Sequence, residues 1–198
     1  MIRTDENIVR AILRTYEDTI FDTVHGAWSD WRELPLAGRL LFPGRTRACL
    51  VHDFMVQRAI AAPTGNSAVR VIRQDETAKF VVADQVLLRF KKADDRGLGS
   101  NIPTQASLGF VEQQHELPGI PNVHKVEVVY ALNRLQTQID RVAVVARDGD
   151  ALLWDYAIVP TTTAEVISLP APALQPTQGA RVRVRKGDEA DKKKDTGE

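Results

Sequence analysis

The hydrophobic spacing of the chain changes from helical to strand-like at about residue 68, and this change restricts the fold more than any other feature. Before it, apolar residues recur every three or four positions, as on one face of a helix. After it, short runs rich in Val, Ile, Leu and Phe alternate with polar turns, as in strands. Helices followed by strands predict an α+β fold.

Two helices are expected before residue 68. The first covers residues 5–31, with Thr4 as its N-cap and with Asp5 and Glu6 in the first turn, where the helix dipole favours anions. Its apolar face comprises Ile8, Ile12, Leu13, Tyr16, Ile20 and Val24. The spacing therefore predicts one apolar face along this helix.

The second helix is expected at residues 46–61. Its candidates for burial are Cys49, Leu50, Phe54, Met55 and Ile60. Between the two helices, residues 34–44 contain Pro35, Gly38, Pro43 and Gly44 among apolar side chains, which is typical of an ordered connector. Such a connector lies in the core or forms a contact between two copies of the chain, and the sequence leaves both open.

Six strands and one further helix are expected after residue 68. The strands are predicted at residues 69–73, 79–83, 86–92, 124–133, 139–147 and 151–159. The helix is predicted at 103–115, since Pro103 suits a first helical turn, and Leu117–Pro121 ends it. Most connections have hairpin length, so the sheet should be mostly antiparallel, with about six strands and one inserted helix.

The composition changes after Pro160. Residues 161–198 are rich in Pro and mixed charge and poor in aromatic residues, which predicts a disordered C-terminal tail behind a single domain at 1–160. Basic residues of the tail can contact nucleic acid, or they only keep the terminus soluble.

Charge and cysteine content restrict the class of protein. Lys+Arg and Asp+Glu both number 26, so a protein that simply coats nucleic acid is not expected. The single cysteine cannot form an internal disulfide, which fits a reducing compartment. The N-terminus lacks the apolar stretch of a signal peptide, and no apolar run approaches the ~20 residues of a membrane span. We therefore expect a cytoplasmic protein without a membrane partner.

The strand at 86–92 ends in cations and is the first candidate site. Arg89 and Lys91 share one strand face about 7 Å apart and repel each other unless they are solvated or paired, and Lys92 follows them. This favours a contact with phosphate or with an acidic partner. The alternative is a solvated strand end with Asp94 and Asp95 as counter-ions.

The polar segment after this strand extends the candidate binding surface. Gly97 and Gly99 stand near a helix start, where backbone N–H groups can meet an anion, and we add Ser100, Asn101 and Gln105 to the surface. The order of residues matches neither a P-loop nor a dinucleotide fingerprint. The alternative is a turn in which Ser100 or Asn101 caps the next helix.

Catalytic and metal-binding motifs are incomplete. The four histidines form no zinc-binding pattern, and no cofactor or metal is predicted. A metal-dependent nuclease needs clustered carboxylates near a lysine, and Asp84, Glu17 and Lys91 are the candidates for such a cluster. The acid expected two residues before the lysine is replaced by Arg89. The sequence therefore identifies no catalytic residue, and it leaves open whether the chain is an enzyme.

Three segments resemble a recurrent family of uncharacterised bacterial proteins. They are RFKK, SNIPTQ and LPGIP in order within Leu88–Pro121, GRTRACLVHD at Gly44–Asp53, and KVEVVYALN at Lys125–Asn133. Similar proteins occur on phage-like and mobile elements, near helix-turn-helix repressors or metalloprotease-like partners. The resemblance covers about residues 35–158 and implies a two-gene module of the toxin–antitoxin or phage-regulation kind. It transfers no functional residue.

These observations lead to one principal hypothesis and one alternative. The first is a cytoplasmic regulatory or interaction protein of such a module, which binds a protein partner encoded nearby through the cationic strand and the following loop. The alternative is a toxin-like nuclease or a nucleic-acid-binding protein that grips phosphates with Arg89, Lys91 and Lys92. Both hypotheses leave open whether the chain forms a homo-oligomer.

Overall fold

The computed structural model describes residues 4–161, except 63–67, 75–76, 102–103 and 116–121. The predicted tail at 161–198, apart from Thr161, lies outside the described residues, as do Pro103 and the segment LPGIP. The contacts of the chain separate residues 1–163 from residues 164–198, and the description below concerns the first unit.

The first predicted helix is an α1 (Glu6–Leu13), a 3-10 turn η1 (Arg14–Tyr16) and an α2 (Glu17–Glu33) in direct succession. Its N-cap is Asp5, not Thr4, because Asp5 Oδ1 accepts the backbone N–H groups of Asn7 and Ile8. Thr4 is buried, and its carbonyl accepts a hydrogen bond from Trp154 Nε1 at 2.9 Å. Thr4 thus ties the start of the chain to the sheet.

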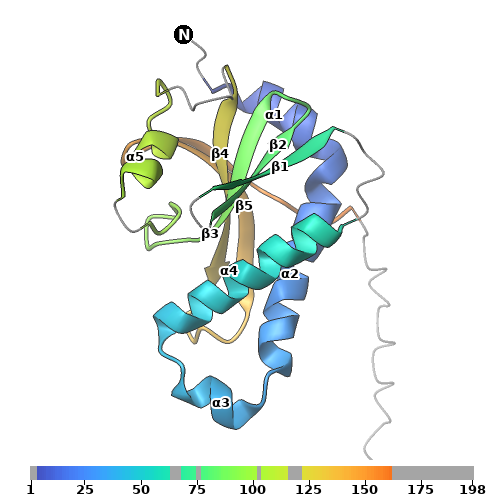
Figure 1. The fold of residues 1–198 in the computed structure, drawn as a ribbon, viewed down its shortest axis with the longest axis vertical. Helices are drawn as coiled ribbons and strands as arrows, with labels where there is room; N and C mark the ends of the chain where they lie inside the picture. Colours follow the sequence, from blue (N-terminus) through green and yellow to red (C-terminus); the bar gives the residue numbers. More distant parts are fainter. Residues whose placement is uncertain (1–3, 63–67, 75–76, 102–103, 116–121, 162–198) are drawn as a thin grey trace, which may run out of the picture. The chain divides into compact units, whose positions relative to one another are not determined.

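The connector and the second helix differ from expectation in two details. Residues of the connector form a short α3 (Leu36–Leu41), and α4 (Gly44–Ala61) begins two residues earlier than predicted. In α4, Val51 and Met55 are fully buried, whereas Cys49, which we expected in the core, is exposed. The other four expected residues agree with the prediction, because Met55 belongs to the core and Leu50, Phe54 and Ile60 pack partly buried against it. Figure 1 shows α2 and α4 crossing side by side, joined at one end by α3.

The sheet has six strands in sequential order. They are β1 (Val69–Gln74), β2 (Thr77–Val82), β3 (Val86–Lys92), β4 (His124–Leu132), β5 (Ile139–Asp148) and β6 (Ala151–Ala157). Neighbouring strands are antiparallel except β3 and β4, which are parallel. The helix α5 (Gln105–Val111) lies in the connection between them, as a parallel crossover requires. The prediction of an α+β fold with a mostly antiparallel sheet is confirmed.

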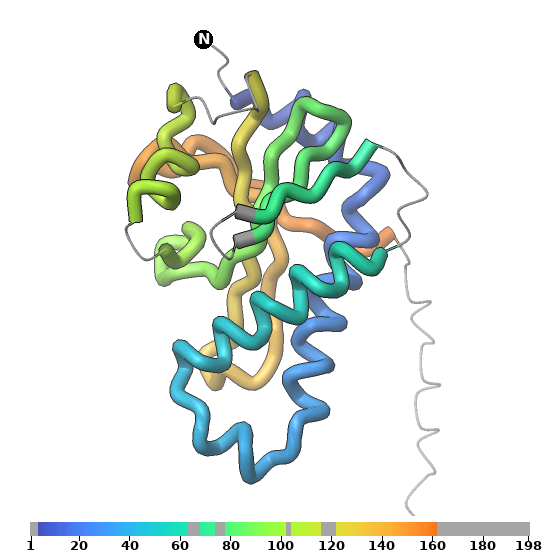
Figure 2. The backbone as a smooth tube through the Cα atoms, viewed as in Figure 1, coloured from blue at the N-terminus to red at the C-terminus, as the bar shows by residue number. Residues whose placement is uncertain are grey.

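The two faces of the sheet are covered differently. The main core lies between one face and the helices α1, α2 and α4, and it includes Val24, Trp28, Met55, Phe90 and Tyr130. On the other face two smaller clusters form, one with Phe110 and Val111 of α5 and one with Leu98 of the loop after β3. Figure 2 traces α5 and this loop on the side away from α2 and α4. The second face is therefore covered mainly by a polar loop and a short helix.

The register of β2 and β3 leaves the end of β3 without a ladder partner from β2. In the part of the chain that the structure describes, their ladder runs from Val82↔Val86 to Phe80↔Leu88, although β3 extends to Lys92. Since β4 pairs with the whole of β3, only the edge toward β2 and α4 is affected. This edge carries the candidate site.

Among the described residues, no helix has the length and apolar character needed to span a bilayer.

Candidate functional site: a cationic groove between α4 and β3

A cavity of about 480 Å³ lies between the first half of α4 and the end of β3. We call it the α4–β3 groove. Its lining residues are Arg45, Ala48, Cys49, His52 and Asp53 of α4, Ala78 of β2, Arg89, Phe90, Lys91 and Lys92 of β3, and Ser100 of the following loop. Helix α4 and strand β3 thus bring residues some 40 positions apart in the sequence to one surface.

The lining of the groove carries more positive than negative charge. Arg45, Lys91 and Lys92 form no ion pair with any residue that the structure describes, whereas Asp53 is the one carboxylate among the lining residues. The Asp53 side chain is largely exposed, and its Oδ1 lies 3.4 Å from Nδ1 of His52. The groove therefore favours an anion.

Lys91 is the most unusual of these cations because it is half-buried. Burial lowers the pKa of Lys91 below its ordinary value, and the neighbouring charge of Arg89 lowers it further, while Glu127 opposes the shift. Burial likewise lowers the pKa of His52, Asp53 raises it, and Lys91 adds to the lowering. A shifted cation that lines a cavity is typical of a binding site.

Arg89 differs from its neighbours, because its charge is already neutralised inside the protein. Its Nε and Nη2 both donate to Glu127 Oε1, at 3.0 and 2.7 Å, and the side chains of both residues are buried. The guanidinium carbon also lies 3.9 Å from the centre of the Phe110 ring. Arg89 therefore holds α5 and β4 to β3, and it lines the groove without offering a free charge.

Glu127 is the centre of a buried polar network. Its Oε2 accepts the backbone N–H of Gly99 at 3.2 Å and lies 3.7 Å from Nη1 of Arg147, while its Oε1 also accepts Nδ2 of Asn101 at 3.3 Å. Arg147 in turn donates to the carbonyls of Gly99 and Gly149. The polar loop after β3 is thereby anchored onto the sheet by a carboxylate, and its polarity serves the fold.

Gly99 is required by this network. A Cβ at this position would lie 2.4 Å from Glu127 Oε2, closer than side chains tolerate. Gly97 has φ +80°, a left-handed conformation that glycine adopts without strain. The two glycines thus shape a loop that approaches Glu127 closely, and neither is used to expose N–H groups to an external anion.

Lys125 is a second buried cation with an internal role. Its Nζ donates to three backbone carbonyls, those of Gly109, Glu112 and His115, and the residue is 3 % exposed. These carbonyls belong to the last turn of α5 and the residues after it, where a helix leaves acceptors unpaired. Lys125 therefore fixes the end of α5 on β4.

The other predicted site residues fall in three different places. Ser100 lines the groove, and its backbone N–H donates to the carbonyl of Lys92 at 2.8 Å. Asn101 belongs to the buried network. Gln105 is exposed at the start of α5 and does not line the groove. The cap of α5 is Thr104, in a reciprocal pair with Ser107, and not Ser100 or Asn101.

The acidic residues after β3 are not counter-ions of the groove. Asp94 accepts the backbone N–H groups of Arg96 and Leu98, each at 2.9 Å, and pairs with the Arg96 side chain. No ion pair joins Asp94 or Asp95 to Lys91 or Lys92 within the described part of the chain. The solvated strand end with local counter-ions is therefore not what the structure has.

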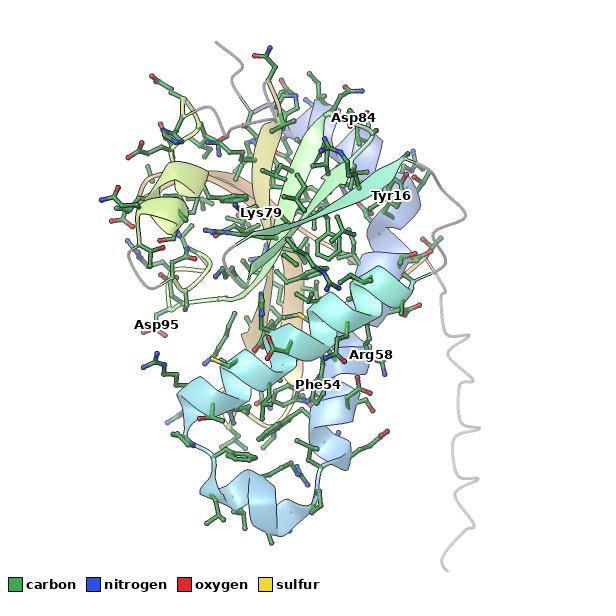
Figure 3. All side chains as sticks on the ribbon, in the orientation of Figure 1. Tyr16, Phe54, Arg58, Lys79, Asp84 and Asp95 are labelled. Atoms are coloured by element: carbon green, nitrogen blue, oxygen red, sulfur yellow. The ribbon has the colours of Figure 1, made fainter. Side chains whose placement is uncertain are left out.

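The three residues weighed for a nuclease site are far apart. Asp84 lies in the turn before β3 and pairs with Arg70, seven residues and about 20 Å along the strand from Lys91. Figure 3 shows Asp84 and Asp95 at opposite ends of β3. Glu17 begins α2 and interacts with Tyr156. In the ranges described, no cluster of three His, Cys, Asp or Glu side chains has the arrangement of a metal site.

Sequence reasoning missed Glu127, Arg147 and Lys125. Each is a charged residue on a strand whose other residues are mostly apolar, for example Glu127 among Val126, Val128 and Val129. A charge in the middle of a buried strand needs a partner of opposite sign, so Glu127 was a signal for the partner of Arg89.

The comparisons with protein-family models, curated proteins and solved structures find no match for this chain.

Proposed function

We propose that this chain is a regulatory or interaction protein that binds an acidic segment of a protein partner in the α4–β3 groove. The observation that carries the proposal is Lys91, a half-buried ammonium without an ion pair among the described residues, in a cavity that Arg45 and Lys92 also line. A partner that supplies carboxylates would complete the pairing of these cations.

Electrostatics supports an anionic ligand. A cation removed from water loses solvation, and unless it is paired this loss is a net cost to the folded protein. Two other buried cations, Arg89 and Lys125, each donate two or more hydrogen bonds to oxygen atoms of the protein. Lys91 differs from them, because it has no ion pair among the described residues. A carboxylate arriving from a ligand would restore its ordinary pKa and contribute to binding energy.

The edge of β3 supports an extended ligand. Among the described residues, the ladder with β2 stops beyond Leu88, and the α4–β3 groove lies along this edge, where the carbonyl of Lys92 already accepts the Ser100 N–H. Unpaired strand edges accept extended peptide segments through main-chain hydrogen bonds, with side chains adding specificity. An acidic segment in extended form would thus align with β3 and bring its carboxylates toward Lys91 and Lys92.

The binding of nucleic-acid phosphates is the alternative function. The same three cations would serve it, and its signature would be an affinity that falls steeply with rising salt. One observation favours the protein ligand over nucleic acid: the chain has no net formal charge. A nuclease built on Asp84, Glu17 and Lys91 has no support from the positions of these residues.

The family resemblance suggests where the partner comes from. The context implied by the motifs is a two-gene module, so we propose that the partner is encoded beside this chain and carries the acidic segment. The role would then be that of an antagonist or regulator of the partner, in the manner of a toxin–antitoxin pair.

The experiment is a selection of displayed random 12-residue peptides on the folded full-length protein, with removal of peptides that bind Lys91→Glu/Lys92→Glu. We expect the remaining peptides to be enriched in Asp and Glu. Each should lose affinity at least about tenfold on Lys91→Glu/Lys92→Glu and keep it on Arg70→Glu, which reverses one positive charge at an exposed position of β1.

Two results would overturn the proposal. One is a selection that yields no peptides dependent on Lys91 and Lys92. The other is a protein that binds a random single-stranded DNA 20-mer through these cations more tightly than any selected peptide at physiological salt, which would make the groove a phosphate site.

A further inference from the structure

The short helix α3 carries a cluster of exposed apolar side chains. The exposed fractions are 61 % for Leu36, 76 % for Leu40, 82 % for Leu41 and 41 % for Phe42. We call these four residues the α3 tip. Single exposed leucines are ordinary on protein surfaces, but four large apolar residues within seven positions form a patch of the kind that marks an interaction site.

The α3 tip is an ordered part of the fold. Phe42 packs against Trp31 of the core with ring centres 6.0 Å apart. Arg39 Nε donates to the carbonyl of Leu34 at 2.9 Å, and the backbone N–H of Arg39 donates to the carbonyl of Pro35. These contacts fix the turn between α2 and α4, so the exposure of Leu40 and Leu41 is a feature of the folded chain. Figure 2 shows this turn at the end of the two helices.

The α3 tip lies close in sequence to one residue that lines the α4–β3 groove. Phe42 precedes Arg45 by three residues, and three residues of chain span about 10 Å at most. Arg45 lies in the first turn of α4 and lines the groove. A ligand in the groove that extends toward the start of α4 would therefore reach the apolar side chains of the tip.

We propose that the partner's acidic segment is flanked by large apolar side chains, which pack on Leu40 and Leu41 while its carboxylates occupy the groove. This inference rests on the function proposed above and specifies its ligand. Apolar area removed from water supplies affinity, and the cations supply register and selectivity. A purely acidic ligand would leave the tip exposed to water and would bind weakly.

Charge complementarity favours this occupant over a second copy of the chain. Arg39, Arg45 and Arg47 surround the tip in sequence, and α3 itself carries no acidic residue. Two tips brought together would place these arginines against one another, which like charges disfavour. A ligand that combines carboxylates with apolar side chains meets both the leucines and the arginines.

The test compares two variants that should both fold, since each replaces exposed leucine. Leu40→Ser/Leu41→Ser alters the tip, and Leu152→Ser replaces a leucine of β6 that is 48 % exposed. The probes are the acidic 12-residue peptides selected on the wild-type protein, together with versions in which every Leu, Ile, Phe and Trp is replaced by Ser. Affinities are measured by fluorescence anisotropy.

We expect the unmodified peptides to lose affinity about tenfold or more on the tip variant and to keep it on Leu152→Ser. The serine-substituted peptides should bind all three proteins equally and still depend on Lys91. Equal affinity of the unmodified peptides for wild type and the tip variant would overturn this inference while leaving the proposed function intact. If no acidic peptide is selected at all, the proposed function fails first.

Two further measurements decide between occupants. Sedimentation equilibrium of wild type and the tip variant would overturn the inference if a dimer forms only when Leu40 and Leu41 are present. Flotation with vesicles of phosphatidylglycerol and phosphatidylcholine would overturn it if binding depends on the same leucines, because the tip would then be a membrane contact. A monomer that ignores such vesicles supports the peptide ligand.

Discussion

Arg89 and Glu127 are direct register partners on the parallel strands β3 and β4, and their side chains form a buried ion pair with a closest distance of 2.7 Å. This relationship separates the cations of β3 into two kinds. Arg89 is paired inside the protein, whereas Lys91, two residues later, lines the groove without an ion pair in the described ranges. The proposed binding role follows from that difference.

The first prediction concerns the centre of the network. Replacing Glu127 with Gln leaves Arg89 buried without its carboxylate partner and leaves Arg147 paired with the exposed Asp150 alone among the described residues. Removal of one partner from a buried ionic group typically costs about 3–5 kcal/mol. We expect a loss of this size in the free energy of unfolding, measured by urea denaturation.

The matched control is Asp150→Asn, which removes the exposed negative charge that pairs with Arg147. Surface ion pairs contribute about 0–1 kcal/mol, so this variant should stay close to wild type. Equal stability of Glu127→Gln and Asp150→Asn would mean that the buried network does not hold the loop after β3.

The second prediction concerns the close approach of Gly99 to Glu127. In Gly99→Ala the new Cβ would meet the carboxylate at 2.4 Å, so the network must shift, and we expect a loss of about 1–3 kcal/mol. Gly38→Ala is the control, because a Cβ at Gly38 in α3 meets nothing within 4 Å. It should leave stability unchanged or raise it by up to about 1 kcal/mol. Thermal unfolding measures the stability of both variants. A Gly38→Ala variant less stable than Gly99→Ala would refute the packing described for Gly99.

The third prediction compares two half-buried or buried lysines. Lys91→Met removes a cation that has no ion pair with any described residue and should raise the free energy of unfolding by about 1 kcal/mol. Lys125→Met leaves three carbonyls at the end of α5 without their donor and should lower it by about 1–3 kcal/mol. Denaturation in urea measures both. If Lys91→Met were less stable than wild type, Lys91 would stabilise the fold, and this would contradict a role for it in ligand binding alone.

The sign of the pH dependence follows from the lowered pKa of Lys91. Between that pKa and the ordinary value the unfolded chain binds more protons than the folded one, so wild-type stability rises with pH in this window. The difference in free energy of unfolding between Lys91→Met and wild type should therefore become smaller as the pH approaches the ordinary pKa of lysine. An advantage that grows with pH would contradict the direction of the shift.

The fourth prediction concerns ligand binding at alkaline pH. Lys91 must be charged to pair with a carboxylate, so affinity for a selected acidic peptide should fall as the pH rises from about 8 toward the ordinary lysine pKa, a range in which histidines are already neutral. In this window, binding should take up protons. Lys91→Arg keeps its charge and should show a flatter profile. Calorimetric titrations at several pH values measure this, and identical profiles for the two proteins would assign the pairing to another group.

Much of the fold could be predicted from the sequence because hydrophobic periodicity is local. All six strands lie within a few residues of their expected positions, and the inserted helix was expected, although α5 is shorter than the predicted 103–115. The burial of Cys49 was predicted wrongly, although Met55, Leu50, Phe54 and Ile60 of the same helix contact the core as expected, since helical spacing alone did not reveal where the edge of the buried stripe lies. Local spacing gives an element, and tertiary contacts decide its orientation.

The candidate site was predictable only in part. The cations of β3 stand out in the sequence, but only the structure separates Arg89 from Lys91. Arg89 pairs with Glu127, 38 residues later on the neighbouring strand, whereas Lys91 has no ion pair with the residues described. The contribution of α4 to the groove depends on the crossing of helix and strand, for which the sequence has no local signal. Pairing across a parallel crossover is a long-range property of the fold.

The most direct measurement of ligand binding in the groove uses Cys49, the one cysteine of the chain, which is exposed and lines the groove. The rate of its alkylation by iodoacetamide is measured with and without a saturating acidic peptide selected as above. We predict that the peptide slows alkylation at least about tenfold in wild type and in Arg70→Glu, and leaves it unchanged in Lys91→Glu/Lys92→Glu. A peptide that binds the wild-type protein but leaves the alkylation rate of Cys49 unchanged would contradict the account, because the ligand would then lie outside the α4–β3 groove.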